Sequence, residues 1–155
     1  MGQHLAAMLV VLAGAMPAAG CASDGVRMDP LPPVYARYAG RAFELLEVQE
    51  FRLAFEKILP EGAPKWFRAL EGPSPPAGWV GVGEQGYIVV HSCKPHACRW
   101  NRVIMLFGPV PPYRVVAALV QDPDEEGPAM PEVRWLGRPE PDERSVLESL
   151  MGQRL

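Results

Sequence analysis

The sequence predicts one α+β domain: an antiparallel sheet of about five strands, with a helix before it and a short helix after it. Three observations predict this class. Hydrophobic residues recur at helical spacing before residue 60, and five short runs of strand-forming residues follow. The connections between these runs are too short to contain crossover helices, so neighbouring strands must be antiparallel. The 155 residues leave room for one domain.

The two helices are predicted from spacing and from their ends. In residues 44–59, Val48, Phe51 and Phe55 recur on one face while charged residues occupy the others, and a proline and a glycine follow directly. The closing helix covers residues 142–151 and begins with acidic residues, where the helix dipole favours them.

The strand signals lie between these helices. Runs of β-branched and aromatic residues alternate with short segments rich in glycine and proline, which is typical of a meander of hairpins. A Gly-Glu-Gln-Gly turn at 83–86 joins the first two runs. The predicted strands are 79–82, 87–93, 102–107, 113–120 and a fifth around Val133 and Trp135.

Composition excludes several classes of protein. With 15 glycines, 18 prolines and 21% charged residues, the chain is neither a collagen nor a coiled coil. A net charge of −3 and a pI near 5.6 argue against nucleic-acid binding, because no basic field is present. The sequence shows no Ser/His/Asp order, glycine-rich phosphate loop or informative carboxylate pair, so we expect no enzyme and no cofactor.

The N-terminus predicts export. Residues 1–20 contain no charged side chain, and the apolar run 5–16 is too short to span a bilayer but suits a signal peptide. The following Cys21 lies in an Ala-Ala-Gly-Cys segment that resembles a bacterial lipobox, so it is a candidate for lipidation and anchoring to the outer membrane. The alternative is ordinary cleavage, with Cys21 free or removed. We expect a proline-rich tether over 21–36 and the folded domain over 37–155.

Four potential metal ligands lie within eight residues: His91, Cys93, His96 and Cys98. They permit a zinc-binding or thiol-redox site, although structural zinc usually takes two separated ligand pairs. Redox motifs of the thioredoxin type have two residues between the cysteines, whereas four lie here. An oxidising compartment favours a disulfide between the neighbouring cysteines instead. Spacing alone leaves these alternatives open.

A disulfide here would close a very small loop. It would contribute only about 2 kcal/mol to stability by chain entropy, which is a weak reason to keep it in a domain of this size. Fixing the shape of Lys94, Pro95 and His96 is a better reason, since a stiff loop loses little entropy on binding a partner.

The segment Cys93-Lys94-Pro95-His96-Ala97-Cys98 resembles the CKPHxC signature of the Ivy family, the inhibitors of vertebrate (c-type) lysozyme in Gram-negative bacteria. The similarity extends over about residues 43–150. It includes the segments Phe43–Leu46, Pro64–Trp66, Asn101-Arg102 and Trp135–Gly137.

The resemblance implies a periplasmic, often dimeric inhibitor that fills the lysozyme cleft with this loop and so protects peptidoglycan. Retaining glycosidases use two carboxyl groups about 5 Å apart. An imidazole between them can hydrogen-bond to both, so His96 is expected to insert there, with Lys94 at the rim and the Cys93–Cys98 bond fixing the loop. Some members of the family are thought to restrain the cell's own lytic transglycosylases.

Two features depart from the family pattern. Ala97 replaces a polar residue and so removes a side-chain hydrogen bond, and Arg99-Trp100 replaces a Gly-Ser pair. Trp100 can either clash with the rim of the cleft or anchor there.

Other conspicuous residues have structural explanations. His91 is expected to be half-buried on a strand face with Tyr87 and Val89, and the acidic run 122–126 is expected to be a solvated turn that could steer encounter with a basic partner. The other tryptophans of the domain, Trp66, Trp79 and Trp135, are expected in the core.

Overall fold

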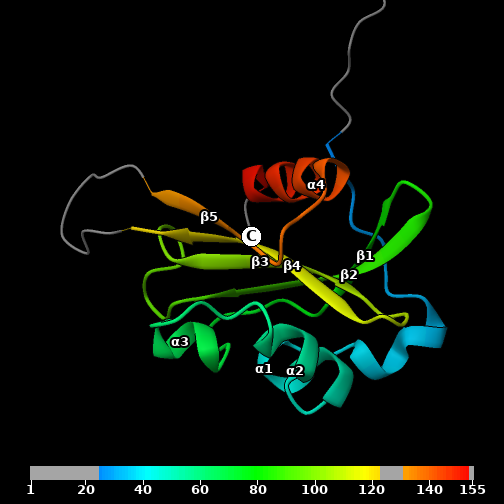
Figure 1. Ribbon diagram of the computed structural model, residues 1–155, viewed down its shortest axis with the longest axis horizontal. Coiled ribbons are helices and arrows are strands. Elements are labelled where there is room, and N and C mark those ends of the chain that lie inside the picture. The colour runs from blue at the N-terminus through cyan, green and yellow to red at the C-terminus, as the bar shows by residue number, and fades with distance from the viewer. Residues whose placement is uncertain (1–24, 123–130, 154–155) are drawn as a thin grey trace, which may run out of the picture.

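The five predicted strands form one antiparallel sheet in the order β1-β2-β3-β4-β5 (Figure 1). The computed structural model describes residues 25–122 and 131–153. The first hairpin turn is shorter than predicted, because β2 begins at Gln85 rather than after Gly86. The strands are β1 (Gly78–Val82), β2 (Gln85–Cys93), β3 (Arg102–Gly108), β4 (Arg114–Gln121) and β5 (Glu132–Leu136).

The predicted helix over 44–59 is wrong in extent, because the chain forms two helices there. Val48 has an extended backbone and its carbonyl accepts the first hydrogen bond of the second helix, from the Arg52 N–H at 2.9 Å. The periodicity continues through this break because both helices pack on the same core. The elements before the sheet are η1 (Pro33–Tyr38), α1 (Ala42–Leu45), α2 (Gln49–Glu56) and α3 (Lys65–Arg68).

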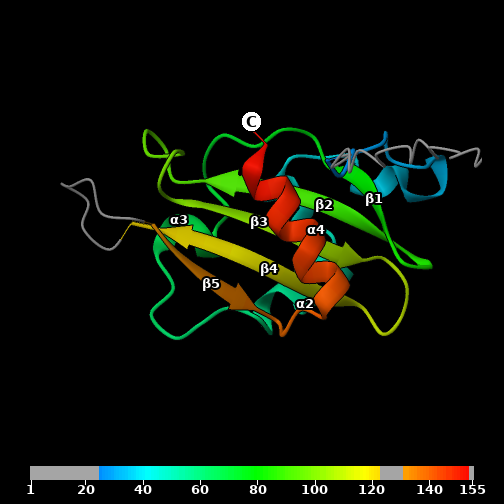
Figure 2. The ribbon, with the colours of Figure 1, turned by 90° about the horizontal axis from the view of Figure 1, so that it is seen from above.

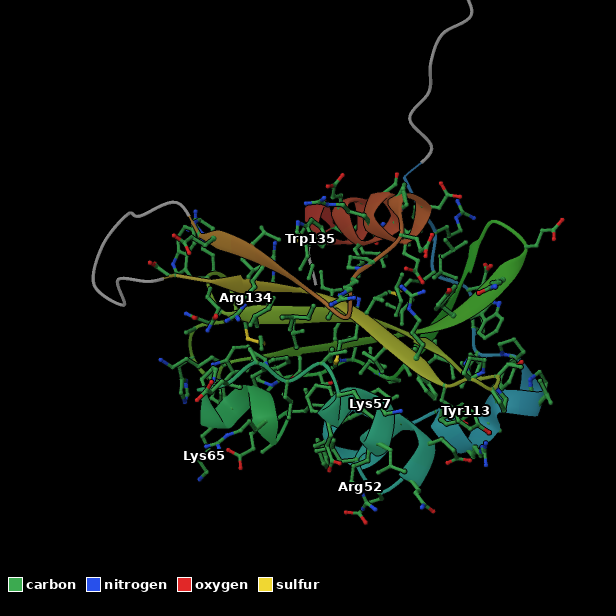
Figure 3. The ribbon with its side chains drawn as sticks, viewed as in Figure 1. Arg52, Lys57, Lys65, Tyr113, Arg134 and Trp135 are labelled. Atoms are coloured by element: carbon green, nitrogen blue, oxygen red, sulfur yellow. A yellow bond between two sulfur atoms is a disulfide. The ribbon has the colours of Figure 1, made fainter. Side chains whose placement is uncertain are left out.

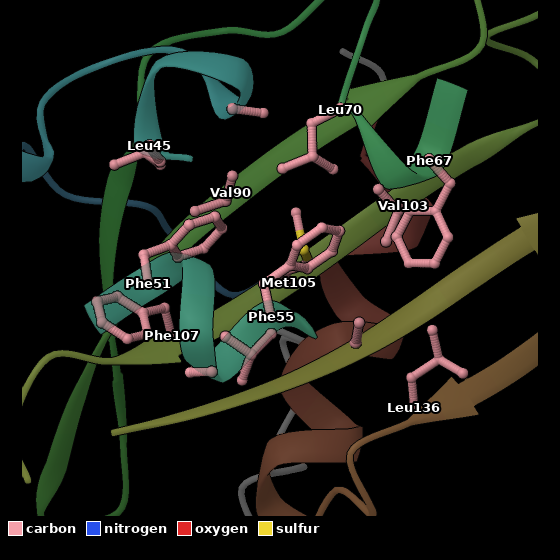
Figure 4. Close-up of a cluster of buried hydrophobic side chains, with 14 of the residues drawn as sticks. Leu45, Phe51, Phe55, Phe67, Leu70, Val90, Val103, Met105, Phe107 and Leu136 are labelled. Carbon is pink, nitrogen blue, oxygen red and sulfur yellow. The ribbon is translucent and has the colours of Figure 1, made fainter. Parts of the chain in front are cut away.

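The helices before the sheet cover one of its faces and enclose an aromatic core (Figure 4). The ring of Phe107 on β3 lies edge-on to Tyr38 at 5.3 Å and to Phe51 at 5.4 Å between ring centroids. Phe55 continues this cluster to Phe67 on α3. Through this packing, α3 and the segment after it lie beside the end of β2.

The opposite face is covered by α4 (Pro141–Gly152), which lies across the strands (Figure 2). Leu147 and Leu150 are buried there against Val89 and Ile104. The predicted closing helix over 142–151 is thus confirmed, one residue longer at each end.

A buried carboxylate joins α4 to the sheet. Glu143 is 2% exposed, and its oxygens accept hydrogen bonds from the Tyr87 hydroxyl at 2.8 Å, from Arg114 Nη2 at 2.8 Å and from the Glu140 N–H at 2.7 Å. Burial and the bond to Glu143 raise the pKa of Tyr87 to about 12, so its hydroxyl stays a donor. Because these three hydrogen bonds are directed and two of them come from the sheet, the network fixes the position of α4.

The N-terminal segment packs on the domain from residue 25 onward. The Val26 N–H donates to Ser149 Oγ at 3.1 Å, Asp29 forms a β-bridge with Trp79, and η1 begins at Pro33. The part of the expected tether that the structure describes, 25–36, is therefore in contact with the sheet and α4. The predicted signal peptide and Cys21 lie outside the described residues. Across residues 25–122 and 131–153, no helix is long and apolar enough to cross a membrane.

We predict that Glu143→Ala lowers the free energy of unfolding by about 3 kcal/mol, because it leaves a partly buried arginine unpaired. Glu148→Ala is the matched control: its ion pair with Arg144 is exposed on both sides, so the loss should stay below about 1 kcal/mol. Denaturant unfolding of both variants measures this. Equal losses would show that the buried network does not hold α4.

Candidate functional site

The β2–β3 hairpin ends in a loop closed by a disulfide between Cys93 and Cys98. The predicted pairing is confirmed, with the two Cα atoms 4.8 Å apart. Cys93 is the last residue of β2, and β3 begins at Arg102, directly opposite it in the ladder. The loop therefore projects from one of the two central hairpins of the sheet. We call residues 93–98 the disulfide loop.

Backbone hydrogen bonds brace the disulfide loop from within. The Lys94 N–H donates to the Asn101 carbonyl at 2.9 Å, and the Ala97 N–H donates to the Lys94 carbonyl at 3.0 Å. The N–H groups of Trp100 and Asn101 both donate to the Ala97 carbonyl, at 3.1 and 2.9 Å. The loop thus forms two successive tight turns, and its backbone has little freedom.

The tip of the loop presents His96 to solvent. Pro95 and His96 are exposed, and His96 adopts a left-handed backbone with φ of +64°. A non-glycine residue pays roughly 1 kcal/mol or more for this conformation, although histidine tolerates it better than most. The disulfide and the turns on both sides hold His96 in this shape.

A cation–aromatic pair flanks the loop. The guanidinium carbon of Arg99 lies 4.3 Å from the centroid of the Trp100 ring, and Arg99 is exposed while Trp100 is half-buried. Stacking of this kind keeps a cation beside the loop without an acidic partner. Arg99 and Trp100, the two residues that depart from the family pattern, therefore form an ordered pair at the surface beside the loop.

A segment distant in sequence supports the loop from below. In residues 70–74, which we call the support segment, Gly72 has φ of +135°, and a Cβ there would lie 1.9 Å from the Cys93 carbonyl oxygen. The Ser92 hydroxyl donates to the Leu70 carbonyl at 3.2 Å. The Ser74 hydroxyl donates to the His91 carbonyl at 2.6 Å and accepts from the Ala42 N–H at 2.9 Å. The loop is therefore held against the α1–α3 layer.

His91 is more deeply buried than predicted. It lies on the α4 face of β2 and is 3% exposed, because α4 covers this end of the strand. Among the described residues, neither ring nitrogen of His91 has a hydrogen-bond partner. Burial, with a smaller contribution from the charge of Arg102, lowers the pKa of His91 to about 4. His91 is thus a neutral core residue.

The zinc or redox alternative is not supported. Both sulfur atoms of the proposed site are joined in the disulfide. Within the described residues, no group of three His, Cys, Asp or Glu side chains is placed to hold a metal ion.

The remaining predicted residues fall in several environments. Asp122 is 8% exposed rather than solvated, and residues 123–126 of the acidic run lie outside the described part. Trp66 is buried, whereas Trp79 and Trp135 are half-buried, Trp79 stacking on Tyr35 at 5.0 Å between centroids. Lys94 and Ala97 are half-buried parts of the loop wall.

Sequence reasoning missed the support segment. Gly72 and Ser74 stand in a proline- and glycine-rich stretch, residues 72–78, that lies outside every predicted helix and strand. The contacts of Gly72 and Ser74 join residues 17 to 32 positions apart, so local spacing gives no signal for them. A glycine among prolines was the one hint that the backbone there needs a special conformation.

The fold and the loop define a small α+β protein that displays a rigid, disulfide-closed loop at the end of a covered sheet. The family model Ivy, inhibitor of vertebrate lysozyme, matches residues 50–150. A curated relative, the inhibitor of vertebrate lysozyme of Pseudomonas aeruginosa, is 31% identical over 128 residues, which cover 78% of this chain and 82% of the relative. The chain belongs to the Ivy family.

We predict that the folded protein loses stability as the pH falls from about 6.5 to about 4. In the unfolded chain His91 binds a proton below its ordinary pKa of 6.5, whereas in the folded state it stays neutral down to about 4. The loss attributable to His91 totals about 3 kcal/mol. In a His91→Leu variant the free energy of unfolding should depend less on pH over this range. Denaturant unfolding at several pH values measures this. An unchanged slope would contradict a neutral His91.

We also predict that Gly72→Ala disturbs the disulfide loop. The added Cβ meets a backbone oxygen, so we expect a loss of about 1–3 kcal/mol in unfolding free energy and shifted NMR resonances for His96. Gly62→Ala is the control, because Gly62 also has a positive φ of +73° but no atom lies within 4 Å of an added Cβ. If both variants shift His96 equally or not at all, the support segment does not position the loop.

Proposed function

We propose that the protein inhibits c-type lysozyme by inserting the disulfide loop into the active-site cleft, with His96 between the two catalytic carboxyl groups. Membership of the Ivy family supports the target. The observation that carries the mechanism is the exposed His96 held in a left-handed conformation at the tip of a disulfide-closed loop. In this proposal the protein binds and blocks an enzyme and performs no chemistry of its own.

The chemistry of the target suits an imidazole. A retaining glycosidase keeps one carboxyl group protonated as the acid and the other ionised, about 5 Å apart. A neutral imidazole can donate to the ionised group through one nitrogen and accept from the protonated group through the other, and an imidazolium can donate to both. His96 supplies both nitrogens at an exposed tip.

Rigidity favours this mode of binding. The two turns of the loop and its disulfide are formed before any partner arrives, so little conformational entropy remains to be lost. Lys94 and Arg99 add positive charge beside the tip, which favours a cleft lined by carboxylates. Trp100, stacked under Arg99, offers an aromatic surface to the rim of the cleft.

The proposed setting is the periplasm. The predicted signal peptide, residues 1–20, supports export, and lipidation of Cys21 would anchor the mature protein to the outer membrane. There the inhibitor would protect peptidoglycan from host lysozyme. A homodimer and the restraint of endogenous lytic transglycosylases are further expectations from the family.

We predict that the oxidised protein inhibits c-type lysozyme stoichiometrically in a cell-wall lysis assay, and that His96→Ala weakens inhibition at least thirtyfold, or about 2 kcal/mol, as expected for a central hot spot. Val110→Ala is the control, since Val110 is 59% exposed in the connection at the opposite end of β3. It should inhibit as the unchanged protein does.

The outcomes separate the parts of the proposal. Full inhibition by a folded His96→Ala variant would overturn the insertion mechanism while leaving lysozyme as the target. An unchanged protein that does not inhibit c-type lysozyme would overturn the target. Titration against lytic transglycosylases then tests the second expectation.

A further inference from the structure

A groove distinct from the disulfide loop lies between α2 and the last two strands. It has a volume of about 820 Å³. Its floor is apolar and formed by the buried side chains of Ala54, Val115 and Leu136, and the turn after α2 contributes a wall through Ile58 and Pro60.

The rim of the groove is positively charged. Lys57, Arg134 and Arg138 are exposed and line it, and no aspartate or glutamate is among the described residues that line it. None of the three side chains makes a hydrogen bond or an ion pair within the described part of the chain. Figure 3 shows Lys57, which directly follows α2, and Arg134 on β5, so the two cations come from separate parts of the fold. Such a concentration of cations is unexpected in a chain with a net charge of −3.

The backbone at the end of β5 is shaped to place Arg138 at this rim. Gly137 and Arg138 have successive positive φ values of +73° and +55°. A Cβ on Gly137 would lie 2.3 Å from the Val115 carbonyl oxygen, so the turn packs directly on β4. The Arg138 carbonyl accepts a hydrogen bond from Arg114 Nη2 at 2.9 Å, which further holds this turn against β4.

The strand beside the groove has an unpaired edge. β5 pairs with β4 along Glu132–Leu136, and in the described residues its backbone makes no hydrogen bond to any other element. Arg134 lies opposite Leu119 and Leu136 opposite Ala117, so both side chains project to the groove side of the sheet. An open edge of this kind can receive an extended segment as an added strand.

We propose that the groove and the β5 edge bind an extended acidic peptide segment of a partner protein. Its backbone would pair with β5, its carboxylates would meet Lys57, Arg134 and Arg138, and its small apolar side chains would lie on the floor. A sugar chain fits less well, because the Trp135 ring that could stack on it packs on the opposite, α4 face of the sheet, under the Arg144 guanidinium at 4.4 Å. A flat anionic membrane fits less well, since the cations border a concave floor.

The test measures binding of a fluorescein-labelled peptide of alternating Glu and Val residues to the purified protein by fluorescence anisotropy. We expect saturable binding that weakens as salt is added, and no binding of the matching Lys-Val peptide. The double variant Lys57→Glu/Arg134→Glu should weaken binding at least tenfold.

The matched control is Arg52→Glu/Lys65→Glu, which makes the same change of charge at exposed positions outside the groove (Figure 3). It should change binding less than twofold, and both double variants should still inhibit lysozyme as the unchanged protein does. Equal weakening by the two double variants would overturn the proposal in favour of diffuse electrostatics. Absence of peptide binding would also overturn the proposal. So would the finding that the groove binds a second copy of this protein, an anionic glycan or anionic vesicles instead of the peptide.

Discussion

The rest of the molecule depends on the antiparallel pairing of β2 with β3. This ladder joins Ile88–Cys93 to Arg102–Phe107, and its buried residues contribute to the cores on both faces of the sheet. The aromatic cluster of α2 packs on Phe107, while α4 packs on Ile104 and Leu106. Because the disulfide loop is the end of this same hairpin, its base is attached to a strand pair that is buried on both faces.

The two faces of the sheet are covered by different kinds of interaction. Hydrophobic packing of aromatic rings and aliphatic side chains holds the α1–α3 layer. A few directed bonds to Glu143 fix α4, and its C-terminal end receives a further bond from Arg102 to the Met151 carbonyl at 2.9 Å. On the same face His91 is buried, and its ring nitrogens have no hydrogen-bond partner in the described part of the chain. Burial on this face therefore lowers the free energy of unfolding at acidic pH, where the unfolded chain can protonate His91 and the folded protein cannot.

Most of the fold could be predicted from sequence because its strands are strongly apolar and their connections are short. The break at Val48 could not, since the hydrophobic spacing continues unchanged across it. The disulfide and the exposure of His96 followed from a local motif of six residues. The depth of His91 and the support under Cys93 did not, because they depend on α4 and Gly72, which approach β2 from distant parts of the chain.

The external support of the loop has a consequence for molecular mimicry. A synthetic cyclic hexapeptide with the same cysteines, proline and histidine would have the loop's covalent structure but no Gly72 packed against its first carbonyl, no Ser74 holding the preceding strand, and no ladder fixing the approach of its two ends. Such a peptide would sample many shapes. Transplanting the loop into another scaffold therefore requires a host that brings a second chain segment, with a glycine at the point of contact, against the base of the hairpin.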